Sequence, residues 1–143
     1  MKLESIPRAE LSRNPDRVLE TVNAGRPVVI EETGHPAAAI VDLIDYQILL
    51  ATIHYYIHRP RIDVEAGLPD TLISGLGGQA RFDAVVGHYL AGAVSLSRAA
   101  EALETSWLEL RRRFSRLGIP IRTGPLDAEG ARQDARVAES FAS

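Results

Sequence analysis

The chain has 143 residues, an apolar share of 45% and a formal net charge of −3 at pH 7. This length fits one ordinary domain or two small ones, and the apolar share excludes a disordered chain. The absence of cysteine excludes disulfides, thiolate catalysis and cysteine metal sites, and it fits a cytoplasmic protein. We expect neither a signal peptide in MKLESIPRAE nor a membrane span.

The first segment of the chain predicts a strand followed by a helix. Residues 1–5 are expected to form a short edge strand that ends before Pro7. The pair Asn14-Pro15 is typical of a helix start, since proline at the first helical position loses no hydrogen bond. Gly25 is placed to end this helix.

A β-hairpin is expected next. Residues 27–32 include a short apolar run, residues 37–42 return as AAAIVD, and Thr33-Gly34 supplies the turn between them. We expect the hairpin to have a mostly buried face.

Residues 43–58 predict a helix that is apolar nearly all round. A small domain cannot bury every side of such a helix, and large exposed apolar patches are uncommon on monomers. We expect one side to meet the hairpin and another to meet a second copy or a neighbouring segment. The simpler interpretation is a homodimer whose interface includes Ile44, Ile48, Leu49, Ile53 and Tyr56.

The rest of the chain is expected to form a linker, a helical domain and a tail. Glycine and proline interrupt residues 61–80, which we interpret as a linker. Residues 81–122 are expected to form an all-α domain, in which a helix that ends at Gly92 supports the two helices that follow it. Residues 123–143 are expected to form a tail helix with a weak, alanine-rich stripe.

Residues 95–118 have the outline of a helix-turn-helix. The second helix is expected to start near Trp107, because Ser106 can cap it and Glu109 follows at the capping-box position. Its apolar residues share one face at helical spacing, namely Trp107, Leu110, Phe114 and Leu117. The opposite face is largely charged and includes Glu109, Arg112, Arg113 and Arg116.

The charge distribution favours DNA contact by this second helix. Residues 81–122 hold seven basic and four acidic side chains, and this is the only net positive segment of the chain. We expect the early helix positions, from Ser106 to Glu109, and Arg113 to approach base edges. Arg112 and Arg116 are expected to contact phosphates. The alternative is a solvated helix face in which the arginines pair with Glu109.

Basic residues also surround the start of the N-terminal helix. Arg8, Arg13 and Arg17 are candidates for contacts with a second stretch of DNA backbone. Because Glu10 and Asp16 are interspersed among them, ordinary solubilising charge is an equal alternative.

No residue pattern predicts an enzyme, a cofactor or a metal site. His54 and His58 are spaced to share a metal on one helix face, but no third ligand or HExxH motif accompanies them. The serine, histidine and aspartate residues lack a nucleophile elbow, and the glycines near Gly75 lack the lysine of a phosphate-binding loop.

Two stretches of the chain resemble known families. The stretch ELSRNPDRVLETVNAGRPVVI, the turn at Gly34 and the return into VDLIDY resemble the Phd/YefM antitoxins. HYLAGAVSLSRAAEAL and RLGIP are similar to a second bacterial family of small helix-turn-helix proteins, often considered antitoxins. The usual turn glycine of that second family corresponds to Glu104, which is unfavourable if the turn requires a positive φ.

The residue patterns and the resemblance together predict an α+β organisation with four parts. These are a Phd/YefM-like α/β dimerisation domain over residues 1–60, a linker over 61–80, a helix-turn-helix domain over 81–122 and a toxin-binding tail over 123–143. The resemblance further implies an antitoxin that binds double-stranded operator DNA as a dimer, represses its own operon and neutralises a small ribonuclease-like toxin. The alternative is a dimeric adaptor that uses a Phd-like platform without binding an operator.

Overall fold

The computed structural model describes residues 3–122. The chain divides into two compact units, unit 1 over Met1–Tyr46 and unit 2 over Gln47–Ser143. Unit 1 contains a three-stranded sheet, whereas the described part of unit 2 is helical. The expected mixed α+β class is therefore confirmed. The expected tail helix over 123–143 lies outside the described residues.

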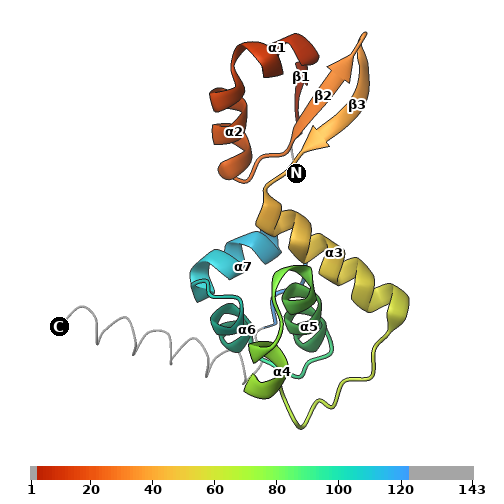
Figure 1. The fold of residues 1–143 in the computed structure, drawn as a ribbon, viewed down its shortest axis with the longest axis vertical. Helices are drawn as coiled ribbons and strands as arrows, with labels where there is room; N and C mark the ends of the chain where they lie inside the picture. The colour runs from red at the N-terminus through yellow and green to blue at the C-terminus, as the bar shows by residue number, and fades with distance from the viewer. Residues whose placement is uncertain (1–2, 123–143) are drawn as a thin grey trace, which may run out of the picture. The chain divides into compact units, whose positions relative to one another are not determined.

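Unit 1 is a small sheet and two helices, and the helices follow the first strand and precede the second along the chain (Figure 1). Strand β1 (Glu4–Pro7) is followed directly by helix α1 (Arg8–Arg13), and α2 (Pro15–Asn23) follows after Asn14. The hairpin consists of β2 (Val28–Glu32) and β3 (His35–Ile40). The strand order is β1-β2-β3, with β1 parallel and β3 antiparallel to β2.

One face of this sheet carries the core of unit 1. Ile6 of β1 lies opposite Ile30, and Ile40 of β3 lies opposite Val28, so these apolar side chains share a face. The helices cover that face with α2 residues Val18 and Val22 and with the half-buried Leu11 of α1, and together these residues form one hydrophobic cluster. The sequence did not predict α1.

The hairpin turn has the expected position but leaves β3 exposed. Thr33 and Gly34 both have positive φ, 49° and 79°. Two such residues are typical of a type I′ turn, whose twist matches that of the flanking strands in a two-residue hairpin. Residues 35–39 of β3 are exposed, and Ile40 is half-buried. The expectation of a mostly buried hairpin is therefore wrong for β3, because helices cover one face of the sheet and centre on β1 and β2.

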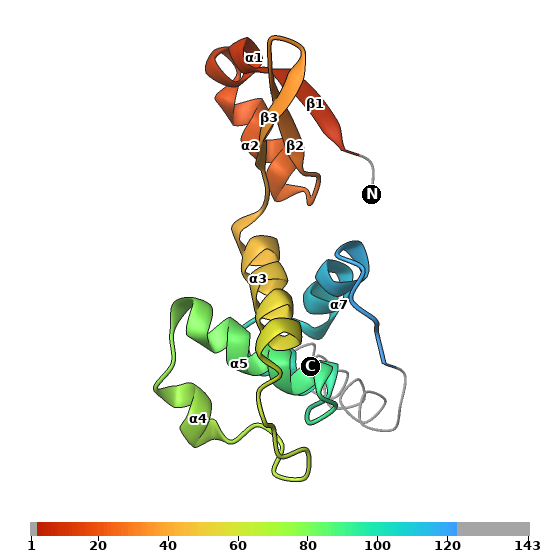
Figure 2. The same ribbon diagram turned by 90° about the vertical axis from the view of Figure 1, so that its right-hand side faces the viewer.

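The helices that follow are α3 (Leu43–His58), α4 (Asp70–Ser74), α5 (Gly78–Leu90), α6 (Leu96–Ala102) and α7 (Trp107–Arg116). Helix α3 has the range that the sequence predicts. In Figures 1 and 2, α5 and α7 lie beside α3. The amide of Gln79 on α5 donates to the carbonyl of Gln47 on α3 at 2.9 Å, which ties these two helices together.

The core of unit 2 includes residues that the sequence assigned to a linker. Leu68 and Ile73 are buried in the same cluster as Val85, Leu96 and Phe114. The division between the units also falls after Tyr46, inside α3, instead of near residue 60. The linker prediction was wrong for this part of 61–80, since its apolar residues complete the helical core.

Arg81 fixes several chain segments of unit 2. Its guanidinium donates to the carbonyl oxygens of Leu76 at 3.0 Å, Ile73 at 3.2 Å and Ala102 at 3.4 Å. The carbonyls of Ile73 and Ala102, near the ends of α4 and α6, therefore accept hydrogen bonds from a side chain outside their own helices.

Candidate nucleic-acid interface

Both helices of the helix-turn-helix begin at serine caps. The hydroxyl oxygen of Ser95 accepts a hydrogen bond from the Arg98 amide at 3.1 Å, and that of Ser106 accepts one from the Glu109 amide at 3.1 Å. A side-chain cap of this kind contributes about 1 kcal/mol to a helix. The predicted starts of α6 and α7 are confirmed.

The turn between the two helices passes through a left-handed residue. Glu104 has φ 58°, where glycine is ordinarily preferred. Its amide donates to the carbonyl of Glu101 at 3.1 Å, and the Thr105 amide donates to that of Ala100 at 3.0 Å. These two bonds close the end of α6, so the turn keeps the geometry that glycine favours while carrying a glutamate.

One face of α7 is anchored in the core of unit 2. Leu110 and Phe114 are fully buried, and Trp107 and Leu117 pack against the same cluster as half-buried residues. The ring of Phe114 lies 5.0 Å from that of Tyr89 on α5, measured between centroids. This packing confirms the predicted apolar face and fixes which side of α7 meets solvent.

The outer face of α7 consists of Leu108, Arg111, Arg112 and Ser115, which are all exposed. Arg111 stacks over the Trp107 ring, with its guanidinium carbon 5.3 Å from the ring centroid. Leu108 is 49% exposed, although it is a large apolar residue. Leu108 lies within the range 106–109 that was expected to approach base edges, and the helical spacing places Leu108 and Arg111 away from Leu110 and Phe114.

Two of the residues predicted to contact DNA form an ion pair with each other. The Nε of Arg113 lies 3.2 Å from a carboxylate oxygen of Glu109, one turn earlier on α7, and the Arg113 side chain is only 15% exposed. Arg116 is half-buried, whereas Ser106 and Arg112 are exposed. The readily accessible positive charge therefore centres on Arg111 and Arg112 instead of on Arg113.

Other arginines of unit 2 hold the fold together. A guanidinium nitrogen of Arg98 donates to the carbonyl of Leu68 at 3.1 Å, and it also pairs with Asp70. Arg122 donates to the carbonyl of Val94 at 2.7 Å, and its guanidinium carbon lies 4.2 Å from the Tyr89 ring centroid. Arg81, Arg98 and Arg122 therefore donate hydrogen bonds to backbone carbonyls within unit 2.

The N-terminal arginines occupy different environments in unit 1. Arg8 pairs with Glu32 at 2.7 Å, although both side chains remain largely exposed. Arg13, at the end of α1, is exposed. Arg17 lines a pocket of about 300 Å³ beside Glu4 and Glu10.

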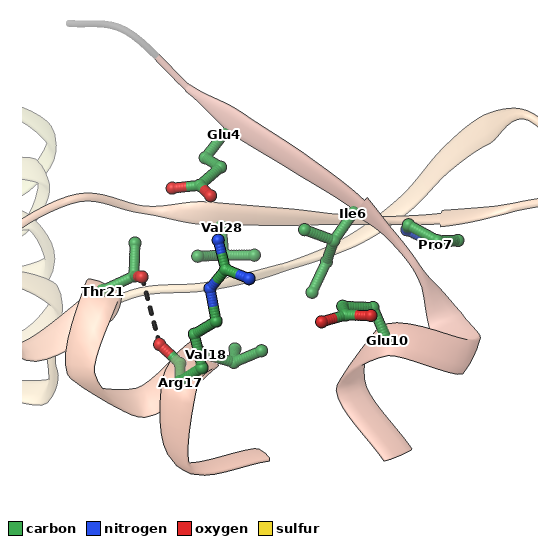
Figure 3. Close-up of a pocket in the computed structure, with 8 residues that line it drawn as sticks. All are labelled: Glu4, Ile6, Pro7, Glu10, Arg17, Val18, Thr21 and Val28. Carbon is green, nitrogen blue, oxygen red and sulfur yellow. Dashed lines mark hydrogen bonds between the residues drawn. The ribbon is translucent and has the colours of Figure 1, made fainter. Parts of the chain in front are cut away.

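In Figure 3 the side chain of Arg17 extends from α2 toward β1 and Glu4. The Thr21 hydroxyl donates to the Arg17 carbonyl at 3.1 Å and fixes the helix backbone beside the pocket. The acidic residues around Arg17 make this pocket a poor phosphate site, since carboxylates repel phosphates.

The predicted dimerisation residues on α3 point to different sides. Ile48 is fully buried in the core of unit 2, so it is not available to a second copy and its assignment was wrong. Ile53 and Tyr56 are exposed, Ile44 is exposed to a smaller extent, and Leu49 is half-buried. Ile53 and Ile57 lie on the side of α3 opposite Ile48, whereas Ile44 lies one turn before Ile48 on the same side.

The described residues offer no metal centre. The rings of His54 and His58 lie 4.6 Å apart between centroids, as neighbours one turn apart on α3. Within residues 3–122, no group of three or more His, Cys, Asp or Glu side chains is placed to hold a metal ion. Across the same residues, no helix is both long and apolar enough to cross a membrane.

Comparisons of the chain with the profiles of known protein families, with curated proteins and with solved structures give no match.

Proposed function

We propose that the chain is a DNA-binding antitoxin that represses its own operon, with α7 as the helix that enters the major groove. The observation that carries this proposal is the outer face of α7. Arg111 and Arg112 are exposed there on a helix that a serine cap and a buried apolar face hold in place. A rigid helix after a short turn, with free arginines on its outer side, suits groove binding.

The distribution of contacts on α7 supports a division of roles. Arg111 and Arg112 are the proposed phosphate contacts, with Arg116 beside them, because phosphate contacts position a protein on DNA. Ser106 lies at the start of the helix, where base edges are ordinarily read. The Glu109 carboxylate, which would otherwise repel phosphate, is partly neutralised by Arg113 at 3.2 Å.

The test is binding to the chain's own upstream DNA, measured by fluorescence anisotropy over a range of salt concentrations. We expect Arg111→Ala combined with Arg112→Ala to weaken binding at least tenfold and to lower the salt dependence. Each lost phosphate contact reduces the slope of log affinity against log salt by about 0.9, since it releases fewer counterions.

The matched control removes the same charge elsewhere. Arg26 and Arg61 are exposed and lie outside the proposed interface, so Arg26→Ala combined with Arg61→Ala changes the net charge equally. We expect this control to retain most of the affinity. Equal losses in both double variants would show that DNA binding depends on overall charge and would overturn the role of α7.

Unit 1 is proposed as a Phd/YefM-like dimerisation domain. The support is the order of a strand, two helices and a hairpin, together with the exposed apolar residues Leu43, Ile44 and Tyr46 at the start of α3. Arg8 pairs with Glu32 and Arg17 lies among carboxylates, so these two arginines are poorly placed to bind phosphates. Arg13 is the N-terminal arginine best placed to reach DNA backbone.

The proposed protein partner is a small ribonuclease-like toxin, and residues 123–143 are the proposed capture segment. Removing the residues after Gly124 is expected to free a toxin expressed from the adjacent reading frame, measured as growth arrest. Continued neutralisation by the shortened chain would place the capture element elsewhere.

A dimeric adaptor without operator binding is the second candidate. The exposed Ile53, Tyr56 and Ile57 on α3 favour it, because a continuous apolar helix side suits a protein partner more than DNA. Failure of the unmodified chain to bind its upstream DNA, together with a stable dimer in sedimentation, would favour this function.

A further inference from the structure

Leu108 is exposed at the centre of the outer face of α7. The core of unit 2 buries Leu110 and Phe114 on the opposite side of the helix, so Leu108 has no place in that core. Arg112 and Ser115 follow Leu108 at positions i+4 and i+7, which places all three on one exposed stripe.

The neighbours of Leu108 determine what kind of partner fits it. Arg111 and Arg116 lie on either side of the stripe, so an apolar group stands between positive charges. A purely apolar protein surface would have to desolvate these guanidinium groups, whereas DNA offers them phosphates on both sides of a groove. The centre of the stripe would then face base edges.

We propose that Leu108 reads the C5-methyl group of thymine in the major groove. This inference rests on the proposed function of α7 as a groove-binding helix. Thymine is the base that presents an apolar group there, and apolar side chains contact this methyl in direct readout. Leu108 lies two residues after the Ser106 cap, in the first turn of the helix, which is the part that contacts base edges.

In the first step, the full chain is used to select the duplexes that it binds from a random pool of synthetic DNA with the four ordinary bases. Each thymine of the selected site is then replaced in turn by deoxyuridine, which removes the methyl and leaves base pairing intact. We expect one replacement in each half-site to weaken binding about fourfold, the equivalent of one buried methyl group.

Two leucine variants assign this effect to one side chain. Leu108→Ala is expected to bind the thymine and deoxyuridine sites equally, with weaker affinity for the thymine site than the unmodified chain. Alanine favours helix at this exposed position, so the variant keeps its fold. The control is Leu72→Ala on α4, which removes another exposed leucine of unit 2 and is expected to keep the fourfold discrimination.

The outcomes separate this inference from the proposed function. DNA binding that is insensitive to every deoxyuridine replacement would overturn the role of Leu108 while leaving α7 as the DNA helix. Unchanged discrimination by Leu108→Ala would assign the methyl contact to another residue and would also refute the inference. A chain that enriches no duplex at all would refute the proposed function as well.

Discussion

Replacing Glu104 by glycine is expected to stabilise unit 2. The left-handed conformation at φ 58° costs an L-residue about 1–2 kcal/mol, and glycine adopts it without that cost. Glycine also gives the unfolded chain more freedom, which lowers stability by about 0.4–1 kcal/mol. The difference favours Glu104→Gly over Glu104→Ala by about 0.8 kcal/mol.

Alanine is the proper reference because both substitutions remove the same ion pair. The Glu104 carboxylate lies 3.7 Å from Arg81, but its side chain is 84% exposed. Water screens such a pair, so its loss costs at most about 0.5 kcal/mol. Relative to the unmodified chain, Glu104→Gly is therefore expected to gain about 0.5 kcal/mol, whereas Glu104→Ala is expected to lose a few tenths of a kcal/mol.

Urea unfolding followed by tryptophan fluorescence measures this difference. Trp107 is the single tryptophan of the chain and lies at the start of α7, so its signal reports on unit 2. In thermal unfolding followed by the same fluorescence signal, the expected rise in melting temperature from alanine to glycine is about 3–6 °C for a unit of this size. An alanine variant at least as stable as the glycine variant would refute the left-handed turn.

Three further substitutions test other parts of the fold. Ser106→Ala removes the cap of α7 and is expected to destabilise unit 2 by about 1 kcal/mol in the same urea assay. Phe114→Ala empties a fully buried site and is expected to cost about 3–5 kcal/mol, seen as loss of the cooperative tryptophan transition. Thr33→Asn suits the positive φ of 49° better than a β-branched residue, so slower amide exchange at Ile30 is expected, and unchanged exchange would contradict the turn assignment.

Local signals in the sequence were sufficient to locate most helices. Helix starts depend on residues close together in sequence, such as a serine that caps a nearby amide or a proline at the first helical position. Helices α2, α6 and α7 begin where Asn14-Pro15, Ser95 and Ser106 predict. Helix α1 was missed because it is short, follows Pro7 directly and buries none of its residues completely. It therefore lacks the apolar periodicity that identifies a helix from sequence.

Tertiary contacts explain the errors in residues 61–80 and in α3. The glycines and prolines of this segment indicate a linker, but Leu68 and Ile73 become buried once α5 and α6 are in place. A helix that is apolar all round gives no indication of which side faces its own core. The burial of Ile48 was therefore not predictable without the position of α5.

The outer face of α7 was only partly predictable for a similar reason. The spacing of Leu110 and Phe114 identifies the buried side, and Glu109 and Arg113 are already one turn apart in the sequence. Their ion pair and the low exposure of Arg113 depend on how closely α7 packs in unit 2. The sequence therefore located α7 and its charged face but overestimated the exposure of Arg113.

The structure sets an upper bound on the salt dependence of DNA binding through unit 2. Residues 81–122 hold seven arginines, but Arg81, Arg98 and Arg122 donate to backbone carbonyls, and Arg113 pairs with Glu109. Phosphate contacts by the other three give a slope of log affinity against log salt of about −2.7 for each copy. A dimer that binds through both copies of α7 is then expected to show about −5. A slope near −12 would require many phosphate contacts beyond these three arginines in each copy and would contradict an interface formed mainly by α7.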